Sequence, residues 1–181
     1  MNVKRKILLL EPNYNNKYPP IGLMKIASYH RLLGDEVRFF KGDMKDFVID
    51  CVYERCLVKL NQIQNEINWK LYEKDIKTFI KTKKNNVLDD LLNSIEVDKP
   101  IVKHWLEHFS NYFKKKEYTK PENREWDRIF VTSLFTFYWK KTIETIEFAK
   151  LLVKDEKDLM IGGVMASLLT DEIEAETGMK P

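Results

Sequence analysis

The sequence predicts an α/β protein with a parallel sheet of about four strands, flanking helices and a large helical insertion. Three observations support this prediction. Residues 7–10 form an unbroken apolar run, which is typical of a strand covered on both faces. A loop, a helix and a second strand at 37–40 follow, as in a βαβ unit. Residues 43–161 contain no glycine, and because turns between strands often use glycine, most of this stretch should be helical.

The βαβ unit should place a polar loop at the edge of the sheet where ligands bind. The loop runs from Glu11 to Pro19, and Pro20 suits the first turn of a helix because its missing N–H would have no partner there. A right-handed crossover leaves this loop at the carboxyl edge of the sheet. Residues 1–42 are therefore predicted to be the first part of a flavodoxin-like, or Rossmann-type, domain. The apolar residues at helical spacing before Gly34 are Leu23, Met24, Ala27 and Leu33.

Residues 43–125 are predicted to form the helical insertion. Apolar residues three or four apart indicate one long helix: Ile49, Val52, Cys56, Leu60, Ile63, Ile67 and Leu71. Residues 87–95 indicate a shorter helix. Asp98 and Pro100 mark the start of a third helix, and the lysine-rich stretch 114–125 should be an exposed exit. The apolar stripe expected on the third helix is Ile101, Trp105, Phe109, Tyr112 and Phe113.

Residues 126–181 are predicted to complete the α/β domain. Residues 129–133 read as a third strand, and residues 134–138 as the loop at its carboxyl end. A helix and a fourth strand at 159–161 follow, and the glycine pair Gly162 and Gly163 ends this strand. Because a flavodoxin-like sheet has a fifth strand at this point, we expect the sequence to be part of a longer protein.

Composition limits the other classes of protein. Cys51 and Cys56 would lie about 140° apart on a helix, so they should be neither a disulfide nor a metal pair but reduced thiols, as in the cytoplasm. No apolar run is long enough for a membrane span, and the run near the amino terminus is too short for a signal peptide. The sequence therefore predicts a cytoplasmic protein.

Familiar site motifs are incomplete. His104 and His108 share a helix face, but Trp105 stands where a helical zinc protease needs glutamate and no third ligand is evident, so surface histidines are the better interpretation. The glycine patterns that bind dinucleotides and triphosphates are absent. Residues 43–127 carry sixteen Lys or Arg and sixteen Asp or Glu, so the lysines of 70–84 are interpreted as a solvated face and no nucleic-acid partner is predicted.

Three stretches together carry a resemblance to a known family. They are Glu11–Asn13 with Tyr18–Val37, Thr132–Trp139, and Gly162–Ile173. The chain resembles the amino-terminal, cobalamin-binding-like domain of a branch of radical SAM proteins over residues 6–42 and 128–178, about half its length. The resemblance implies a doubly wound sheet that holds a corrinoid across its carboxyl edge. It also implies a downstream barrel that carries a 4Fe-4S cluster and cleaves S-adenosylmethionine.

The chain departs from the family pattern at several positions. Met165 stands where the family has histidine, Ala166 where it often has proline, and Ser167 where it has threonine. The histidine loop that ligates cobalt in methyltransferase-type cobalamin domains is missing, and so is the C-x3-C-x2-C motif of the barrel. We therefore expect no radical chemistry from this chain alone, and no catalytic or metal-binding residue in it.

Two functions remain open. In the first, the chain holds a corrinoid or part of the substrate for its downstream radical SAM domain. In the second, it is a degenerate interaction module whose helical insertion contacts that domain or a partner protein, and Phe135, Phe137, Tyr138 and Trp139 fill the space of the cofactor. In the first case Ser133 and Thr136 would donate hydrogen bonds, and Met165 would lie nearest the cobalt. The predicted binding residues are Asn13, Pro20, Gly22, Leu23, Ser133, Thr136, Gly162, Gly163, Met165 and Ser167.

Overall fold

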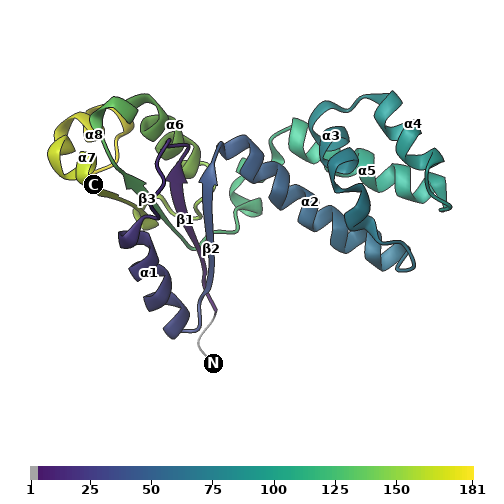
Figure 1. The fold of residues 1–181 in the computed structure, drawn as a ribbon, viewed down its shortest axis with the longest axis horizontal. Coiled ribbons are helices and arrows are strands. Elements are labelled where there is room, and N and C mark those ends of the chain that lie inside the picture. Colours follow the sequence, from purple (N-terminus) through teal and green to yellow (C-terminus); the bar gives the residue numbers. More distant parts are fainter. Residues whose placement is uncertain (1–3) are drawn as a thin grey trace. The chain divides into compact units, whose positions relative to one another are not determined.

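The computed structural model describes residues 4–181, which form two compact units. The first unit combines residues 4–44 with residues 119–181 and contains the sheet. The second unit comprises Lys45–Tyr118 and is entirely helical (Figure 1). The sequence predicted a helical insertion over residues 43–125.

The sheet of the first unit has four parallel strands in the order β2-β1-β3-β4. They are β1 (Lys6–Pro12), β2 (Glu36–Gly42), β3 (Arg128–Ser133) and β4 (Leu159–Gly163). The predicted fold class, a flavodoxin-like α/β arrangement, is confirmed. From β1 the chain first moves outward to β2 and later returns to add β3 on the other side. The carboxyl ends of β1 and β3 therefore form the point where the strand order reverses, which is where open α/β sheets bind ligands.

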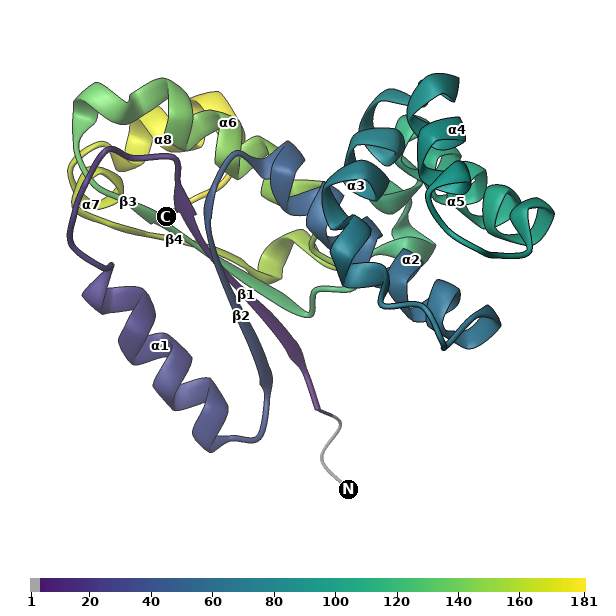
Figure 2. The same cartoon turned by 45° about the vertical axis from the view of Figure 1, so that its right-hand side comes forward.

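Helices cover both faces of the sheet (Figures 1 and 2). On one face lies α1 (Ile21–Leu32), whose Leu23 and Ala27 pack on Ile7 and Leu9 of β1. Successive strand residues point to opposite faces, so Leu8 of β1 points to the other face. There the helices are α6 (Trp139–Lys150), α7 (Val164–Leu168) and α8 (Thr170–Thr177). Short 3₁₀ turns lie at Glu117–Thr119, Pro121–Asn123, Thr136–Tyr138 and Glu156–Asp158.

The outer face of α1 is more apolar than a solvated helix requires. Met24 and Leu33 belong to the apolar residues at helical spacing noted in the sequence, but their exposed fractions are 53% and 49%. The buried residues of α1 are Leu23, Ala27 and His30, because a helix on a sheet covers only one side of itself. The apolar residues of α1 thus cover a wider part of the helix surface than the part that the sheet buries.

The carboxylate of Asp35 fastens the end of α1 to the start of β1. Its Oδ1 accepts from Arg5 Nε at 3.1 Å, and its Oδ2 accepts from Arg5 Nη2 at 2.7 Å. His30 Nδ1 also lies 2.7 Å from Oδ2. These bonds, with that of the Arg5 guanidinium the strongest, lower the pKa of Asp35 from 3.8 to about 2. The charged carboxylate is therefore the form that the folded unit favours.

Replacing Asp35 by asparagine is expected to lower the free energy of unfolding by about 1.5–3 kcal/mol at neutral pH, as for other hydrogen bonds to charged groups. Because the folded pKa lies below the unfolded one, the contribution is complete above about pH 4 and is lost as pH falls toward 2. Urea unfolding of both proteins between pH 6 and pH 2.5 measures this. A difference that does not shrink on acidification would contradict the assignment.

The second unit contains four α-helices among its described residues: α2 (Met44–Ile63), α3 (Glu73–Thr82), α4 (Asn85–Asn93) and α5 (Lys99–Lys114). The predicted continuation of the first helix to Leu71 is wrong. After Ile63 the chain turns into a 3₁₀ helix at Trp69–Tyr72, where Trp69 is buried and donates its indole N–H to Gln64 O at 2.9 Å. Leu71 is instead 76% exposed. In this segment Trp69, and not Leu71, is the large apolar residue in the core.

The lysines of 70–84 do lie on an exposed face, and on its other side α3 buries Ile76, Phe79 and Ile80. One further prediction for this unit needs correction. On α5 the buried residues are Val102, Leu106 and Ser110, one position on from the predicted aromatic stripe. Trp105 of that stripe is only half-buried and has Lys59 Nζ 4.3 Å from its ring centre. Asp98 does cap α5, since its side chain accepts from Ile101 N.

Within the described residues, no helix is both long and apolar enough to cross a membrane. Cys51 and Cys56 are not bridged. Burial raises the pKa of the Cys56 thiol to about 12, so this thiol is unreactive at neutral pH.

Candidate ligand-binding site

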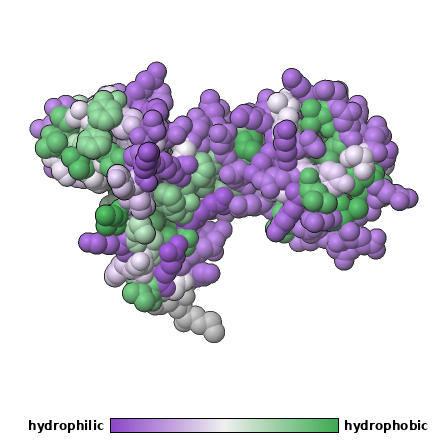
Figure 3. Space-filling model, in the orientation of Figure 1, coloured by the Kyte–Doolittle hydropathy of each residue, from purple (hydrophilic) through white to green (hydrophobic). Residues whose placement is uncertain are grey.

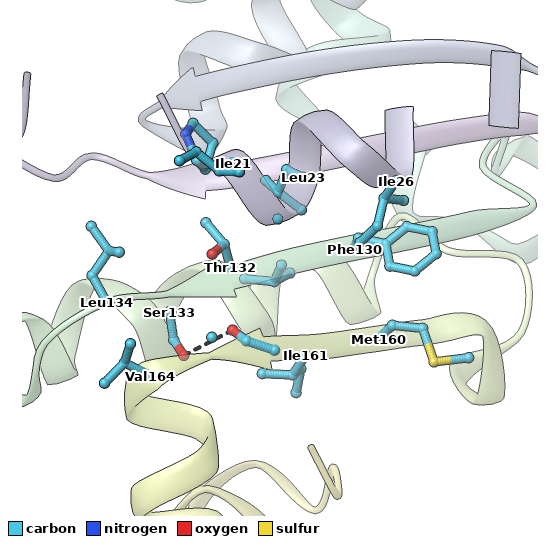
Figure 4. Close-up of a pocket in the computed structure, with 15 residues that line it drawn as sticks. Ile21, Leu23, Ile26, Phe130, Thr132, Ser133, Leu134, Met160, Ile161 and Val164 are labelled. Atoms are coloured by element: carbon cyan, nitrogen blue, oxygen red, sulfur yellow. Dashed lines mark hydrogen bonds between the residues drawn. The ribbon is translucent and has the colours of Figure 1, made fainter. Parts of the chain in front are cut away.

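A pocket of about 290 Å³ lies in the first unit, between the start of α1 and the carboxyl ends of β3 and β4 (Figure 4). Its size is near the lower end for small-molecule sites, and its wall is mostly apolar. Six of the ten predicted binding residues line it: Pro20, Gly22, Leu23, Ser133, Gly162 and Gly163. The position at the strand ends is the one that the βαβ argument predicted.

Strand alternation explains the floor of the pocket. Phe130 and Thr132 of β3 point toward α1, because their neighbours Ile129 and Val131 are buried on the opposite face. The sequence reasoning did not name these side chains, although period-two counting along β3 could have found them. The other lining residues were not named individually, although Ile21, Leu134 and Val164 lie in the loops expected to hold the ligand; they are Ile21, Ile26, Val131, Leu134, Met160, Ile161 and Val164.

The glycines of the site have different roles. A Cβ atom built on Gly22 or on Gly162 would meet nothing within 4 Å, so at both positions the backbone is open. Gly163 has φ 107°, and a Cβ atom there would overlap the carbonyl oxygen of Ser133. Gly163 is thus required by the turn from β4 into α7, whereas Gly162 leaves room for a ligand.

Ser133 was predicted to donate a hydrogen bond to the ligand, but its hydroxyl is already used. It is buried and donates to Gly162 O at 2.9 Å (Figure 4). It also accepts from Ala166 N at 2.9 Å. The side chain therefore fastens β3 to β4 and to the first turn of α7. Ser133 therefore contributes to the site by holding the ends of the two strands in place and not by binding a ligand.

Four predicted residues lie outside the pocket lining. Met165, which was predicted to lie nearest the cobalt, is fully buried and does not line the pocket. Thr136 is exposed in the 3₁₀ turn before α6. Ser167 donates its hydroxyl to Gly163 O at 3.0 Å, and the carbonyl of Asn13 accepts from Lys141 Nζ at 2.7 Å. The pocket is thus lined by only part of the predicted set of binding residues.

The aromatic residues after β3 do not fill the pocket. Phe135 and Phe137 stack on each other with ring centres 5.3 Å apart and are exposed. Tyr138 stacks on Tyr14 at 4.6 Å, and Trp139 donates its indole N–H to Glu176 at 2.8 Å. None of these rings occurs in the pocket lining. The space that they were expected to occupy is open.

The loop after β1 is anchored at its base, and the sequence reasoning missed the residues that anchor it. Tyr14 is buried, contacts the hydroxyl of Thr142, and has its pKa raised by burial. Lys41 of β2 lies 3.2 Å from the buried carboxylate of Glu11 and donates to the carbonyl of Asn16. These contacts hold residues 13–16 beside the strand ends.

No cluster of three or more His, Cys, Asp or Glu side chains that could hold a metal ion occurs in residues 4–181. His104 and His108 flank the ring of Trp105 on α5 in the second unit. Comparison of the chain with protein-family models, with curated proteins and with solved structures finds no match in any of the three.

Proposed function

We propose that the first unit is a cobalamin-binding-like domain that holds a corrinoid at the carboxyl edge of its sheet. The observation that carries this proposal is the apolar pocket at the carboxyl edge of the sheet, between the start of α1 and the ends of β3 and β4, with open backbone at Gly22 and Gly162. A flat ligand can approach a glycine backbone more closely than any side chain would allow.

The rim of the pocket supports a ligand larger than the pocket itself. Figure 3 shows apolar side chains at the surface around α7 and α8. Burying such side chains under a planar ring yields about 25 cal/mol per Å² of apolar surface removed from water. The exposed apolar residues near the strand ends, with exposed fractions from 52% to 82%, are Tyr18, Ile21, Phe135, Phe137, Val164 and Leu168.

In this proposal the pocket and its rim would contact the macrocycle and would leave the metal without a protein ligand. The one histidine of the first unit, His30, is buried near the amino end of β1 and pairs with Asp35. The pocket and its rim would bind the ring and exclude water from one of its faces. A bound corrinoid would supply alkyl-transfer or radical chemistry, while the residues of this chain hold and orient it.

The resemblance to radical SAM proteins suggests the setting of this domain. We propose that it works with a downstream radical SAM domain, which would carry the 4Fe-4S cluster and S-adenosylmethionine. The unbridged cysteines favour a reducing compartment such as the cytoplasm.

Titration with hydroxocobalamin, followed by the visible spectrum of the corrin, tests the proposal. We expect binding below ~100 μM, a concentration at which a useful cofactor site is well filled. Gly162→Trp should weaken binding at least about tenfold, because the new side chain enters the open space of the pocket. Arg31→Trp adds the same side chain at the exposed far end of α1 and should bind as the unchanged protein does.

Two outcomes would overturn the assignment. Binding that survives Gly162→Trp would place the ligand elsewhere. An unchanged protein that binds no corrinoid would leave the second function, an interaction module, as the better one. The observation that favours this second function is the exposed apolar face of α1, which a partner protein or the downstream domain could cover: Met24, Tyr29, Leu32 and Leu33.

A further inference from the structure

Two lysine triplets from distant parts of the sequence meet in the second unit. Ser110 of α5 donates its hydroxyl to Ile80 O of α3 at 3.2 Å, and Lys83 Nζ donates to Asn111 Oδ1 at 2.7 Å. The last turn of α3 therefore lies against the last turns of α5, and the two helices lie side by side in both views (Figures 1 and 2). The lysines that follow these contacts within about two helical turns are Lys81, Lys83, Lys84, Lys114, Lys115 and Lys116, which we term the lysine patch.

The lysine patch has few acidic neighbours among its known contacts, namely Asp46 beside Lys81 and Glu117 directly after Lys116. Glu96 and Asp98 precede α5, whose 16 residues place them about 24 Å from its last turn. Asp46 is 3.3 Å from Lys81, but both side chains are more than half exposed, so salt screens the pair. Six lysines thus lie with two adjacent carboxylates, Asp46 and Glu117, and the patch keeps an excess of positive charge although the total over 43–127 is even.

Helix stability alone does not explain this patch. A lysine near the carboxyl end of a helix is favourable because it complements the helix dipole. Lys83 and Lys116, however, have φ values of 58° and 53°, and they are the two non-glycine residues with positive φ in the described part of the chain. Glycine is the residue that fits such positions at least cost. At both positions the chain carries charge where local stability favours glycine.

Aromatic rings border the lysine patch. Phe113 directly precedes Lys114, and its ring stacks on that of Tyr118 with the centres 6.2 Å apart. Both rings are half-buried, so each retains some accessible surface. Ammonium groups bind phosphates as point charges, and neighbouring aromatic rings offer surfaces on which bases stack.

We propose that the lysine patch binds single-stranded nucleic acid through its phosphate backbone. The patch contains only lysine. Lysine lacks the planar fork with which arginine reads base edges, so binding should depend little on sequence. An acidic polypeptide could use the same lysines but would gain less from the adjacent rings. This inference concerns the second unit and does not depend on the corrinoid proposal.

Fluorescence anisotropy of the full chain with labelled oligo(dT) and oligo(U) 20-mers (about 20 nucleotides, enough to cover a site of this kind) tests the proposal. Binding should weaken about 50-fold between 50 and 200 mM NaCl if about four phosphates are contacted. No binding at 50 mM NaCl would overturn the proposal. A labelled polyglutamate peptide that binds as tightly at equal salt would overturn it in favour of an acidic protein partner.

One variant separates charge from stability. Lys83→Gly with Lys116→Gly should raise the melting temperature, because glycine relieves both positive-φ positions. The same double variant should bind oligonucleotide about 20-fold more weakly at 0.1 M salt, since the loss of each phosphate contact lowers the binding constant roughly fivefold.

The control is Lys99→Gln with Lys103→Gln. Both lysines are exposed at the other end of α5, and the two changes remove the same charge. An equal loss in this control would show that the net charge of the unit, and not the lysine patch, attracts the oligonucleotide.

Discussion

Gly163→Ala is expected to lower the free energy of unfolding of the first unit by about 3 kcal/mol or more. Backbone strain in a region reserved for glycine costs about 1–3 kcal/mol, and the overlap with the Ser133 carbonyl adds about 1–3 kcal/mol of overpacking. The carbonyl belongs to a strand of the sheet and cannot move without breaking the β3–β4 register. Urea unfolding, with hydrogen exchange of peptides from residues 119–181, measures the loss.

Gly162→Ala is the matched control for this variant. The two glycines are neighbours in β4, but a Cβ atom at Gly162 meets open space and its φ is unremarkable for an L residue. We expect a change within about 0.5 kcal/mol, as for surface substitutions away from special features. Similar losses for both variants would mean that the turn into α7 does not depend on the backbone angle of Gly163.

Trp69→Ala is expected to destabilise the second unit by about 3–5 kcal/mol, as other truncations of large buried rings do. The loss includes the indole hydrogen bond to Gln64 O, which holds the turn between α2 and α3. Leu71→Ala, two residues along, removes a side chain that is largely exposed and should change stability by less than about 0.5 kcal/mol. Hydrogen exchange of peptides from residues 45–118 distinguishes this unit from the sheet.

The reverse result would restore the arrangement that apolar spacing alone suggests. If Leu71→Ala proved costly and Trp69→Ala did not, the long helix would continue past Ile63 with Leu71 on its buried stripe. The pair of variants therefore tests the main difference between the predicted and the observed second unit.

Features that depend on near neighbours in the sequence were predictable. The buried run of β1, the proline at the start of α1 and the aspartate cap of α5 each follow from local chemistry. The position of the pocket also followed, because parallel strands end at a common edge. From that rule alone, Pro20, Gly22 and Gly162 could be brought to one site.

Features that depend on which surface is covered were not predictable. Apolar spacing extends to Met24 and Leu33 on α1, but the sheet reaches only one side of that helix. Met165 was expected near the ligand only because of the family resemblance, yet its side chain is fully buried, and the next residue, Ala166, donates its N–H to Ser133. The lysine patch likewise required the pairing of α3 with α5, which no count of charges contains.

The place of the second unit in the chain also has a kinetic consequence. β1 pairs with β3 in a register that joins Ile7 to Arg128, so about 120 residues separate the two partners. Closing a loop of that length costs entropy before any strand contact compensates for it. The contacts of the helical unit are confined to residues 45–118, and helical units rich in local contacts fold fast. If this unit forms first, it replaces most of that loop by a compact body and shortens the flexible chain between β1 and β3. The sheet then remains incomplete, with only β1 and β2, until β3 pairs with β1.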